Sequence, residues 1–210
     1  MPKKKRKVGS GERRYYFSIR YVPSYADFGL LAGRCIYQMH LFSVNNPEVK
    51  NKVGVCFPRW NSKDVGDMIA FVMEDKEALL GLAFQPYFSR MTKEGVFELS
   101  KVDEVPKSSS EVRFVRNQAI GKSFIASKKR RIKRSMTRAE LLDFEHTPVA
   151  VEERVVEHYH RIPISSGSSG QDYILHIQKE RVESRGQQDF SSYGLATKQE
   201  KRGTVPALYI

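Results

Sequence analysis

The pattern of apolar and polar residues predicts alternating strands and helices over the first half of the chain. Residues 14–21 alternate with a period of two, which indicates a strand. From Tyr25 to about Phe42 the apolar side chains recur at helical spacing, and Ser24 can serve as the N-cap. Shorter apolar runs then predict strands at residues 53–57, 67–73 and 95–99, and a helix at residues 76–82.

The order of these elements is β-α-β-β-α-β, which is the order of a ferredoxin-like fold. Sheets of this kind often present RNA. We therefore expect an α+β protein in which residues 12–105 form an N-terminal ferredoxin-like domain.

A short polar connector at residues 106–110 leads into a second part of different character, residues 106–210. We expect this part to be a C-terminal RNA-binding domain with a basic helix and a short sheet. Thr137 and Glu140 have the spacing of a capping box. The predicted elements are a strand at 111–118, helices at 123–134 and 137–144, and strands at 154–162 and 173–178, with a small-residue loop at 165–170.

Charge is unevenly distributed along the chain. The formal net charge is +12, and residues 112–139 contain ten Lys or Arg residues and no Asp or Glu. Arg130, Lys133 and Arg134 project from one face of a helix, with Lys129 nearby. Such segregation indicates an element that binds a polyanion. The alternative is a solvated basic helix face, which the repulsion of like charges four residues apart disfavours.

Other features narrow the class of protein. Residues 2–8 match the classical viral nuclear-localisation signal and residues 9–11 resemble a fusion linker, so we interpret residues 1–11 as a tag that directs the chain to the nucleus. Arg34 interrupts the longest apolar run, which argues against a membrane span. Cys35 and Cys56 form no CxxC pair, and no carboxylate cluster suggests a metal site, so we expect no metal or cofactor.

Four landmarks, in order, resemble the pre-crRNA-processing endoribonuclease of type I-F CRISPR systems. They cover nearly the whole chain after the tag. The landmarks are Met39-His40-Leu41 followed by the GVxFP-like residues 54–58; Arg116-Asn117-Gln118 followed by the basic segment; the serine-rich loop 166–171 followed by Tyr173; and Ser192-Tyr193-Gly194-Leu195 with Val205-Pro206 near the end.

The resemblance implies three catalytic residues. His40 would take the proton from a ribose 2′-OH, because the unperturbed pKa of imidazole, about 6.5, is suited to that role. Ser166 would orient the ribose, and Tyr193 would position the histidine or the nucleotide. The alternatives are a histidine packed on a helix face, a flexible Ser/Gly linker and a core tyrosine, respectively. The other four histidines match no motif of the family.

The resemblance also implies an RNA-binding surface. Arg116 and Gln118 lie two apart on the predicted strand, so both could read purine edges, although Arg116 could instead contact phosphate. Tyr173 would stack on the closing base pair through its ring and not its hydroxyl, unless it is an ordinary strand aromatic. Lysines replace some arginines of the family's basic helix, which favours phosphate contact over base readout. The implied RNA-binding residues are Arg116, Gln118, Lys129, Arg130, Lys133, Arg134, Ser168, Ser169, Gln171 and Tyr173.

As a member of this family, the chain would cut pre-crRNA at the base of the repeat hairpin without a metal, leaving a 2′,3′-cyclic phosphate and a 5′-OH. It would stay on the crRNA 3′ stem-loop as a subunit of a type I-F surveillance complex in the bacterial cytoplasm, and would reach target DNA only through that complex. Residues 190–195 look most like the variants of RNA-guided transposons, which would add a transposition adaptor protein as a partner. Two alternatives are a hairpin-binding subunit without activity and a duplex-DNA binder, the latter disfavoured by the lack of a helix-turn-helix or zinc pattern.

Overall fold

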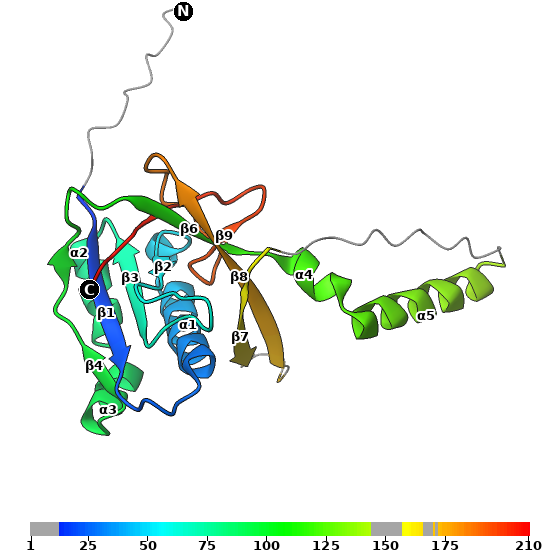
Figure 1. Cartoon of the computed structure of the whole chain (residues 1–210), viewed down its shortest axis with the longest axis horizontal. Coiled ribbons are helices and arrows are strands. Elements are labelled where there is room, and N and C mark those ends of the chain that lie inside the picture. The colour runs from blue at the N-terminus through cyan, green and yellow to red at the C-terminus, as the bar shows by residue number, and fades with distance from the viewer. Residues whose placement is uncertain (1–12, 144–156, 166–169, 171) are drawn as a thin grey trace, which may run out of the picture.

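The computed structural model describes residues 13–143, 157–165, 170 and 172–210, and only the backbone of residues 122–123 and 125–128. Two β-sheets and several α-helices confirm the predicted α+β class (Figure 1). The first part contains β1 (Tyr15–Tyr21), α1 (Phe28–Asn45), a 3-10 turn (Pro47–Val49), β2 (Gly54–Cys56), β3 (Met68–Met73), α2 (Lys76–Ala83), α3 (Pro86–Lys93), β4 (Phe97–Leu99) and β5 (Asp103–Glu104). The second contains β6 (Glu111–Arg116), α4 (Gln118–Ser123), α5 (Ile125–Leu141), β7 (His160–Ser165), β8 (Asp172–Val182), β9 (Ala196–Thr197) and β10 (Val205–Pro206).

The first sheet has the strand order β2-β3-β1-β4, with β5 also paired to β1. All of these pairs are antiparallel. This order confirms the ferredoxin-like arrangement that the sequence of elements predicted. The helix α3, which begins with Pro86 in its first turn, was not predicted from the apolar pattern.

The helix α1 begins three residues later than predicted. Its N-cap is Asp27, whose carboxylate accepts a hydrogen bond from the backbone N–H of Leu30 at 2.9 Å. Ser24 is not the cap, because it lies in a turn closed by a hydrogen bond from Ala26 N to Pro23 O. The assignment of Ser24 as the N-cap was therefore wrong.

The helix α1 lies between the two sheets and contacts both β3 and β7. Its approach to β7 is close at Gly33, where a Cβ atom would lie 1.9 Å from the carbonyl oxygen of Pro163. Only glycine fits at this point of contact. The packing of α1 against β7 therefore fixes how the second sheet sits relative to the residues that α1 carries.

The second sheet has the order β10-β6-β8-β7, and β9 pairs in parallel with β6. Two predicted strands have different bounds. The predicted strand at 154–162, of which residues 154–156 lie outside the described part of the chain, corresponds to β7. This strand begins at His160 and continues through Pro163, because an edge strand tolerates proline. The predicted strand at 173–178 is β8, which extends to Val182 because its polar end pairs with β6.

The basic segment departs from its prediction in two ways. The strand β6 ends at Arg116, and Gln118 is the first residue of α4. One continuous helix, α5, replaces the two predicted at 123–134 and 137–144. Thr137 is not a cap; its hydroxyl donates to the carbonyl of Lys133 at 3.1 Å, as it can inside a helix. Figure 1 shows α5 extending away from both sheets.

Buried apolar side chains from both sheets form one continuous core that includes Phe17, Phe71, Leu175 and Phe190. Arg14, which immediately precedes β1, forms a buried ion pair with Glu111 of β6. The division of the chain at residue 106 into separate domains remains a prediction. Within the described residues, none of the helices has the length and apolar character needed to cross a membrane.

Candidate active site

His40 lies on α1 and is half-buried. Its Nδ1 atom is 3.0 Å from the backbone carbonyl oxygen of Ser192. A carbonyl oxygen can only accept a hydrogen bond, so Nδ1 must carry the hydrogen. The neutral imidazole then has its lone pair on Nε2, and this nitrogen is the one that can accept a proton.

Tyr193 packs beside the imidazole of His40. The two ring centroids are 4.9 Å apart, and the ring planes are inclined by 31°. The backbone turn that carries Tyr193 is closed by a hydrogen bond from Ser191 N to Leu195 O at 2.8 Å, and Gly194 O accepts a hydrogen bond from Val55 N of β2, also at 2.8 Å. The turn is thus attached to the first sheet next to α1.

Gly194 is required in this turn for two reasons. Its φ angle of +70° is one that residues with a side chain rarely adopt. A Cβ atom here would also lie 2.6 Å from Val55 Cγ2 and 2.9 Å from Met39 Cε. The glycine therefore allows the backbone to approach α1 closely enough for the Ser192 carbonyl to reach His40.

Tyr173 on β8 meets Tyr193 from the other side. The Tyr173 hydroxyl donates a hydrogen bond to the Tyr193 hydroxyl, and the ring centroids are 6.1 Å apart. Burial, followed by the hydrogen bond with Tyr193, raises the pKa of Tyr173 above its ordinary value. Tyr173 therefore stays protonated near neutral pH and can act as the donor.

Arg116 at the end of β6 completes the group. Its guanidinium carbon lies 5.6 Å from the centroid of the Tyr193 ring, a cation–π distance. We call these four residues the His40 cluster: His40, Arg116, Tyr173 and Tyr193. The sequence predicted two of them as catalytic and two as RNA-binding, and the fold brings all four together.

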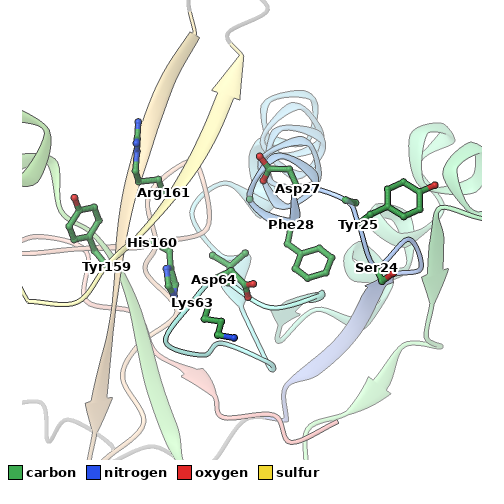
Figure 2. A pocket seen from close by; sticks show the side chains of 12 residues that line it. Ser24, Tyr25, Asp27, Phe28, Lys63, Asp64, Tyr159, His160 and Arg161 are labelled. Atoms are coloured by element: carbon green, nitrogen blue, oxygen red, sulfur yellow. The ribbon is translucent and has the colours of Figure 1, made fainter.

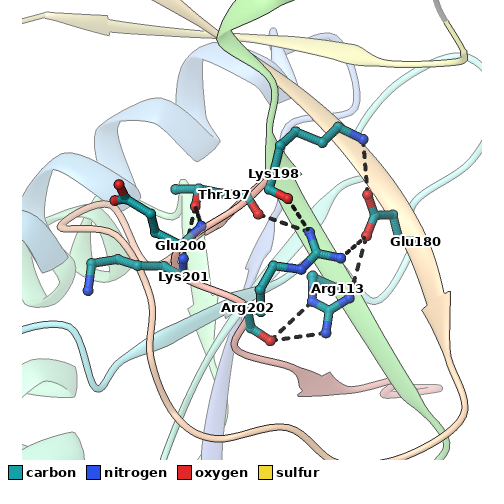
Figure 3. Close-up of polar contacts among 7 residues, drawn as sticks. All are labelled: Arg113, Glu180, Thr197, Lys198, Glu200, Lys201 and Arg202. Atoms are coloured by element: carbon teal, nitrogen blue, oxygen red, sulfur yellow. Dashed lines mark hydrogen bonds and ion pairs between the residues drawn. The ribbon is translucent and has the colours of Figure 1, made fainter.

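An ion-pair network attaches the segment after Tyr193 to the second sheet (Figure 3). Glu180 of β8 pairs with Arg113, Lys198 and Arg202. Burial alone would raise the pKa of Glu180, but hydrogen bonds and charges from Lys198 and Arg202 outweigh it and lower the pKa below its ordinary value. Because β9 also pairs with the end of β6, this segment keeps the turn of Tyr193 next to Arg116.

The described strand ends on either side of the predicted serine-rich loop lie near the His40 cluster. Ser166, Ser168, Ser169 and Gln171 lie outside the described residues. The strand residues that flank the loop, Ser165 and Asp172, are paired with each other, and the next pair is Ile164 with Tyr173. The strand residues that flank the loop are therefore next to Tyr173.

Gln118 does not share a strand with Arg116. It is exposed at the start of α4, whereas Arg116 contacts the ring of Tyr193. The geometric argument that both side chains project from one side of a strand was therefore wrong. Their expected roles in RNA binding remain predictions.

The predicted basic helix is α5. Lys129, Arg130, Lys133 and Arg134 are all exposed on it, and α5 projects from the body of the protein (Figure 1). Its acidic residues are few; between Ile125 and Leu141 only Glu140 is acidic. This helix can therefore present positive charge to a large polyanion without obstruction from the two sheets.

A separate cleft of about 620 Å³ opens at the other end of α1 (Figure 2). Phe28 in the cleft and His40 are twelve residues apart on α1, which corresponds to about 18 Å. The acids of the cleft already serve local structure, since Asp27 caps α1 and Asp64 accepts a hydrogen bond from Gly66 N. The cleft is thus distinct from the His40 cluster. The labelled lining residues are Ser24, Tyr25, Asp27, Phe28, Lys63, Asp64, Tyr159, His160 and Arg161.

The other histidines have structural surroundings. His160 Nε2 lies 2.8 Å from the carbonyl oxygen of Asn61, and its ring packs on Trp60 with centroids 4.3 Å apart. His176 is buried between Tyr159 and Phe124. His146 lies outside the described residues.

A comparison with protein families gives a match over most of the chain. The model of the family described as CRISPR-associated protein (Cas_Csy4) matches residues 16–208, which is most of the chain. No curated protein matches the chain. The matched range contains the whole His40 cluster and the whole of α5.

Proposed function

Because the chain belongs to the Cas_Csy4 family of CRISPR-associated proteins, we propose that it cleaves pre-crRNA through attack of a ribose 2′-oxygen on the adjacent phosphate, with His40 as the general base. Members of this family bind the CRISPR repeat hairpin and process pre-crRNA as endoribonucleases within a type I-F complex. These coarser properties therefore apply to this chain. The proposal concerns the chemistry and the residues that perform it.

The contact between His40 Nδ1 and the Ser192 carbonyl is the observation that supports this chemistry best. It leaves Nε2 free to take the proton of the 2′-OH. The 2′-oxygen then forms a bond to phosphorus while the bond from phosphorus to the 5′-oxygen breaks. The leaving oxygen takes up a proton, and the products are a 2′,3′-cyclic phosphate and a 5′-OH. Imidazole performs the proton transfer itself, so the proposed reaction requires no metal.

The other expected residues act by positioning the RNA. Tyr173 stacks on the base pair that closes the stem and so sets which phosphate reaches His40. Ser166 orients the ribose, Ser168, Ser169 and Gln171 contact nearby phosphate or ribose groups, and Tyr193 holds the imidazole. Gln118 and Arg116 contact the stem. The exposed cations of α5, Lys129, Arg130, Lys133 and Arg134, neutralise phosphates of the hairpin.

Cleavage in EDTA tests the proposal directly. A repeat RNA should be cut at the base of its hairpin in the presence of EDTA, whereas the same RNA with a 2′-deoxy nucleotide at the cut site should bind and remain intact. Cleavage of the deoxy substrate, or a requirement for a divalent metal, would overturn the mechanism. Tight binding of the unmodified RNA without cleavage would instead identify a hairpin-binding subunit without activity.

The same proposal includes the bound RNA, the cellular compartment and a further partner protein. The protein remains on the crRNA 3′ stem-loop, its native compartment is the bacterial cytoplasm, and residues 1–11 direct the tagged chain to the nucleus. The likeness of residues 190–195 to variants of RNA-guided transposons supports a transposition adaptor as a further partner. Fluorescence microscopy of residues 1–210 and 12–210 in eukaryotic cells tests the tag, and recovery of the adaptor with the assembled complex tests the partner.

A further inference from the structure

We propose that Tyr173 is a positioning residue for catalysis through its hydroxyl, which holds Tyr193 against His40. The role expected of Tyr173 from the resemblance depends on its ring alone, and phenylalanine would fulfil it. The additional role rests on the proposed function, in which His40 is the general base. In this role, Tyr173 both contacts the end of the stem and determines the orientation of the His40 imidazole.

Two contacts define the orientation of the His40 ring. The Ser192 carbonyl fixes the Nδ1 edge at 3.0 Å, and the Tyr193 ring covers one face at a centroid distance of 4.9 Å. Both contacts come from adjacent residues of one turn. A shift of the Tyr193 ring would therefore change the direction of Nε2 relative to the ribose, and small misplacements are costly to an aligned reaction.

The backbone of this turn is well fixed, but the far end of the Tyr193 side chain is not fixed by the same bonds. The hydrogen bonds at Gly194 and Leu195 hold the main chain. Besides its packing against the core, the side chain of Tyr193 has a hydrogen bond at its hydroxyl, from Tyr173, and a cation–π contact of its ring with the guanidinium of Arg116. A cation–π contact restrains a ring less strictly than a hydrogen bond does, because it has no single preferred direction within the plane of the ring.

Tyr173 is suited to provide the fixed point. It lies on β8, where it pairs with Ile164 of β7, and from Ile177 onward the same strand also pairs with β6. A phenol with an ordinary pKa of about 10 is protonated over the range in which an imidazole titrates, so Tyr173 can donate throughout, and burial raises its pKa further. The hydrogen bond therefore links a strand of the second sheet to the ring that packs on His40.

This link has a consequence for the choice of the cut site. A hairpin that stacks correctly on Tyr173 leaves its hydroxyl in place for Tyr193. A stem of the wrong length, which displaces the Tyr173 side chain, would also disturb His40. Recognition of the end of the stem and alignment of the base would thus depend on the same side chain.

The test compares Tyr173→Phe, Tyr193→Phe and the double variant in single-turnover cleavage and in binding of a 2′-deoxy hairpin. Tyr173→Phe should bind the hairpin as the parent does, because the ring remains. It should cleave roughly three- to tenfold more slowly, the value of about one hydrogen bond. The double variant should be no slower than the slower single variant, because both substitutions remove one interaction.

The His40 ring resonances in NMR spectra provide a readout that a general loss of stability would not produce. They should shift in Tyr173→Phe, whereas the thermal unfolding midpoint should fall by no more than about 2–4 °C, the value of one hydrogen bond. Parental cleavage by Tyr173→Phe, or rate losses that multiply in the double variant, would overturn the positioning role. If His40→Ala also cleaves normally, the proposed function itself fails; if His40→Ala is inactive, only the role of the hydroxyl fails.

Discussion

His40 and Ser192 are 152 residues apart in the chain, yet Nδ1 of the histidine lies 3.0 Å from the carbonyl oxygen of the serine. The contact uses the backbone of Ser192 and not its side chain. Its geometry depends on Gly194, whose positive φ and lack of a Cβ bring this turn against α1. The C-terminal segment, far from α1 in the sequence, therefore determines which ring nitrogen of His40 carries the hydrogen.

His40→Ala should abolish most cleavage and leave hairpin affinity nearly unchanged, because a proton-transfer group acts mainly in the transition state. The expected loss in single-turnover rate is about 10²- to 10⁴-fold. Gel shifts and cleavage time courses measure the two quantities separately. His158→Ala, which removes a histidine near the cleft at the other end of α1, is the matched control and should cleave normally. A parental rate for His40→Ala would show that another group is the base.

Replacement of Lys129, Arg130, Lys133 and Arg134 by alanine should weaken hairpin binding and flatten its salt dependence, because fewer counterions are released. The slope of the logarithm of the binding constant against the logarithm of the salt concentration changes by about 0.7 for single strands and about 0.9 for duplexes for each lost phosphate contact. A salt titration of the dissociation constant gives this slope. The control replaces three exposed lysines outside α5, Lys93, Lys101 and Lys107. Equal slopes for the α5 variant and the parent would remove α5 from the phosphate-binding surface.

Loss of Glu111 should destabilise the fold. Its carboxylate pairs with Arg14, and the two side chains are only 9% and 6% exposed. Glu111→Ala would leave the guanidinium buried without its partner, at a cost of about 3–5 kcal/mol in the free energy of unfolding. Urea unfolding measures the difference. As the control, Glu98→Ala breaks the exposed pair with Arg20 and should cost less than about 1 kcal/mol in the free energy of unfolding. Similar losses in both variants would contradict the larger contribution of the buried pair.

The fold should lose stability as the pH falls below about 6.5, the usual pKa of histidine in an unfolded chain. Burial lowers the pKa of His160, although its hydrogen bond with the Asn61 carbonyl opposes this shift, and burial followed by the charge of Arg161 lowers the pKa of His176 in the folded protein. The unfolded state therefore binds more protons in this window, and the free energy of unfolding rises with pH. Urea titrations at pH 5.5 and 7.5 check the sign. His176→Phe should reduce the difference between the two pH values, and an unchanged difference would exclude His176 as a source.

The sequence predicted the fold well where a local pattern determines it. The apolar spacing predicted α1, and the order of elements predicted a sheet that the structure confirms. Errors occurred where two local signals compete, as with Ser24 and Asp27 at the start of α1, or where a local signal is overridden. Thr137 and Glu140 have the spacing of a cap, but no Gly or Pro interrupts the residues before them, and α5 continues.

The candidate site could be predicted only in part. The motifs identified His40, Arg116, Tyr173 and Tyr193 as separate residues. Their contacts depend on the register of β8 with β7 and on the path of the C-terminal turn, neither of which is visible in the sequence. The Ser192 carbonyl has no side-chain signal at all, since every residue carries one.

Tyr173→Ala tests whether recognition of the stem and placement of the cut depend on one residue. Loss of the ring should cost on the order of 1–3 kcal/mol in hairpin binding, the value of one stacked base. It should also slow the cut or move it, because the stem would no longer stop at a fixed distance from His40 and because Tyr193 would lose its hydrogen-bond donor. Mapping of the 5′-OH ends locates the cut, and Tyr173→Phe is the control that keeps the ring and so should keep the position. Ile174→Ala, at the neighbouring half-exposed position of β8, controls for a general disturbance of the strand. If Tyr173→Ala retains parental affinity, rate and cut position, Tyr173 is an ordinary strand aromatic and the end of the stem is recognised elsewhere.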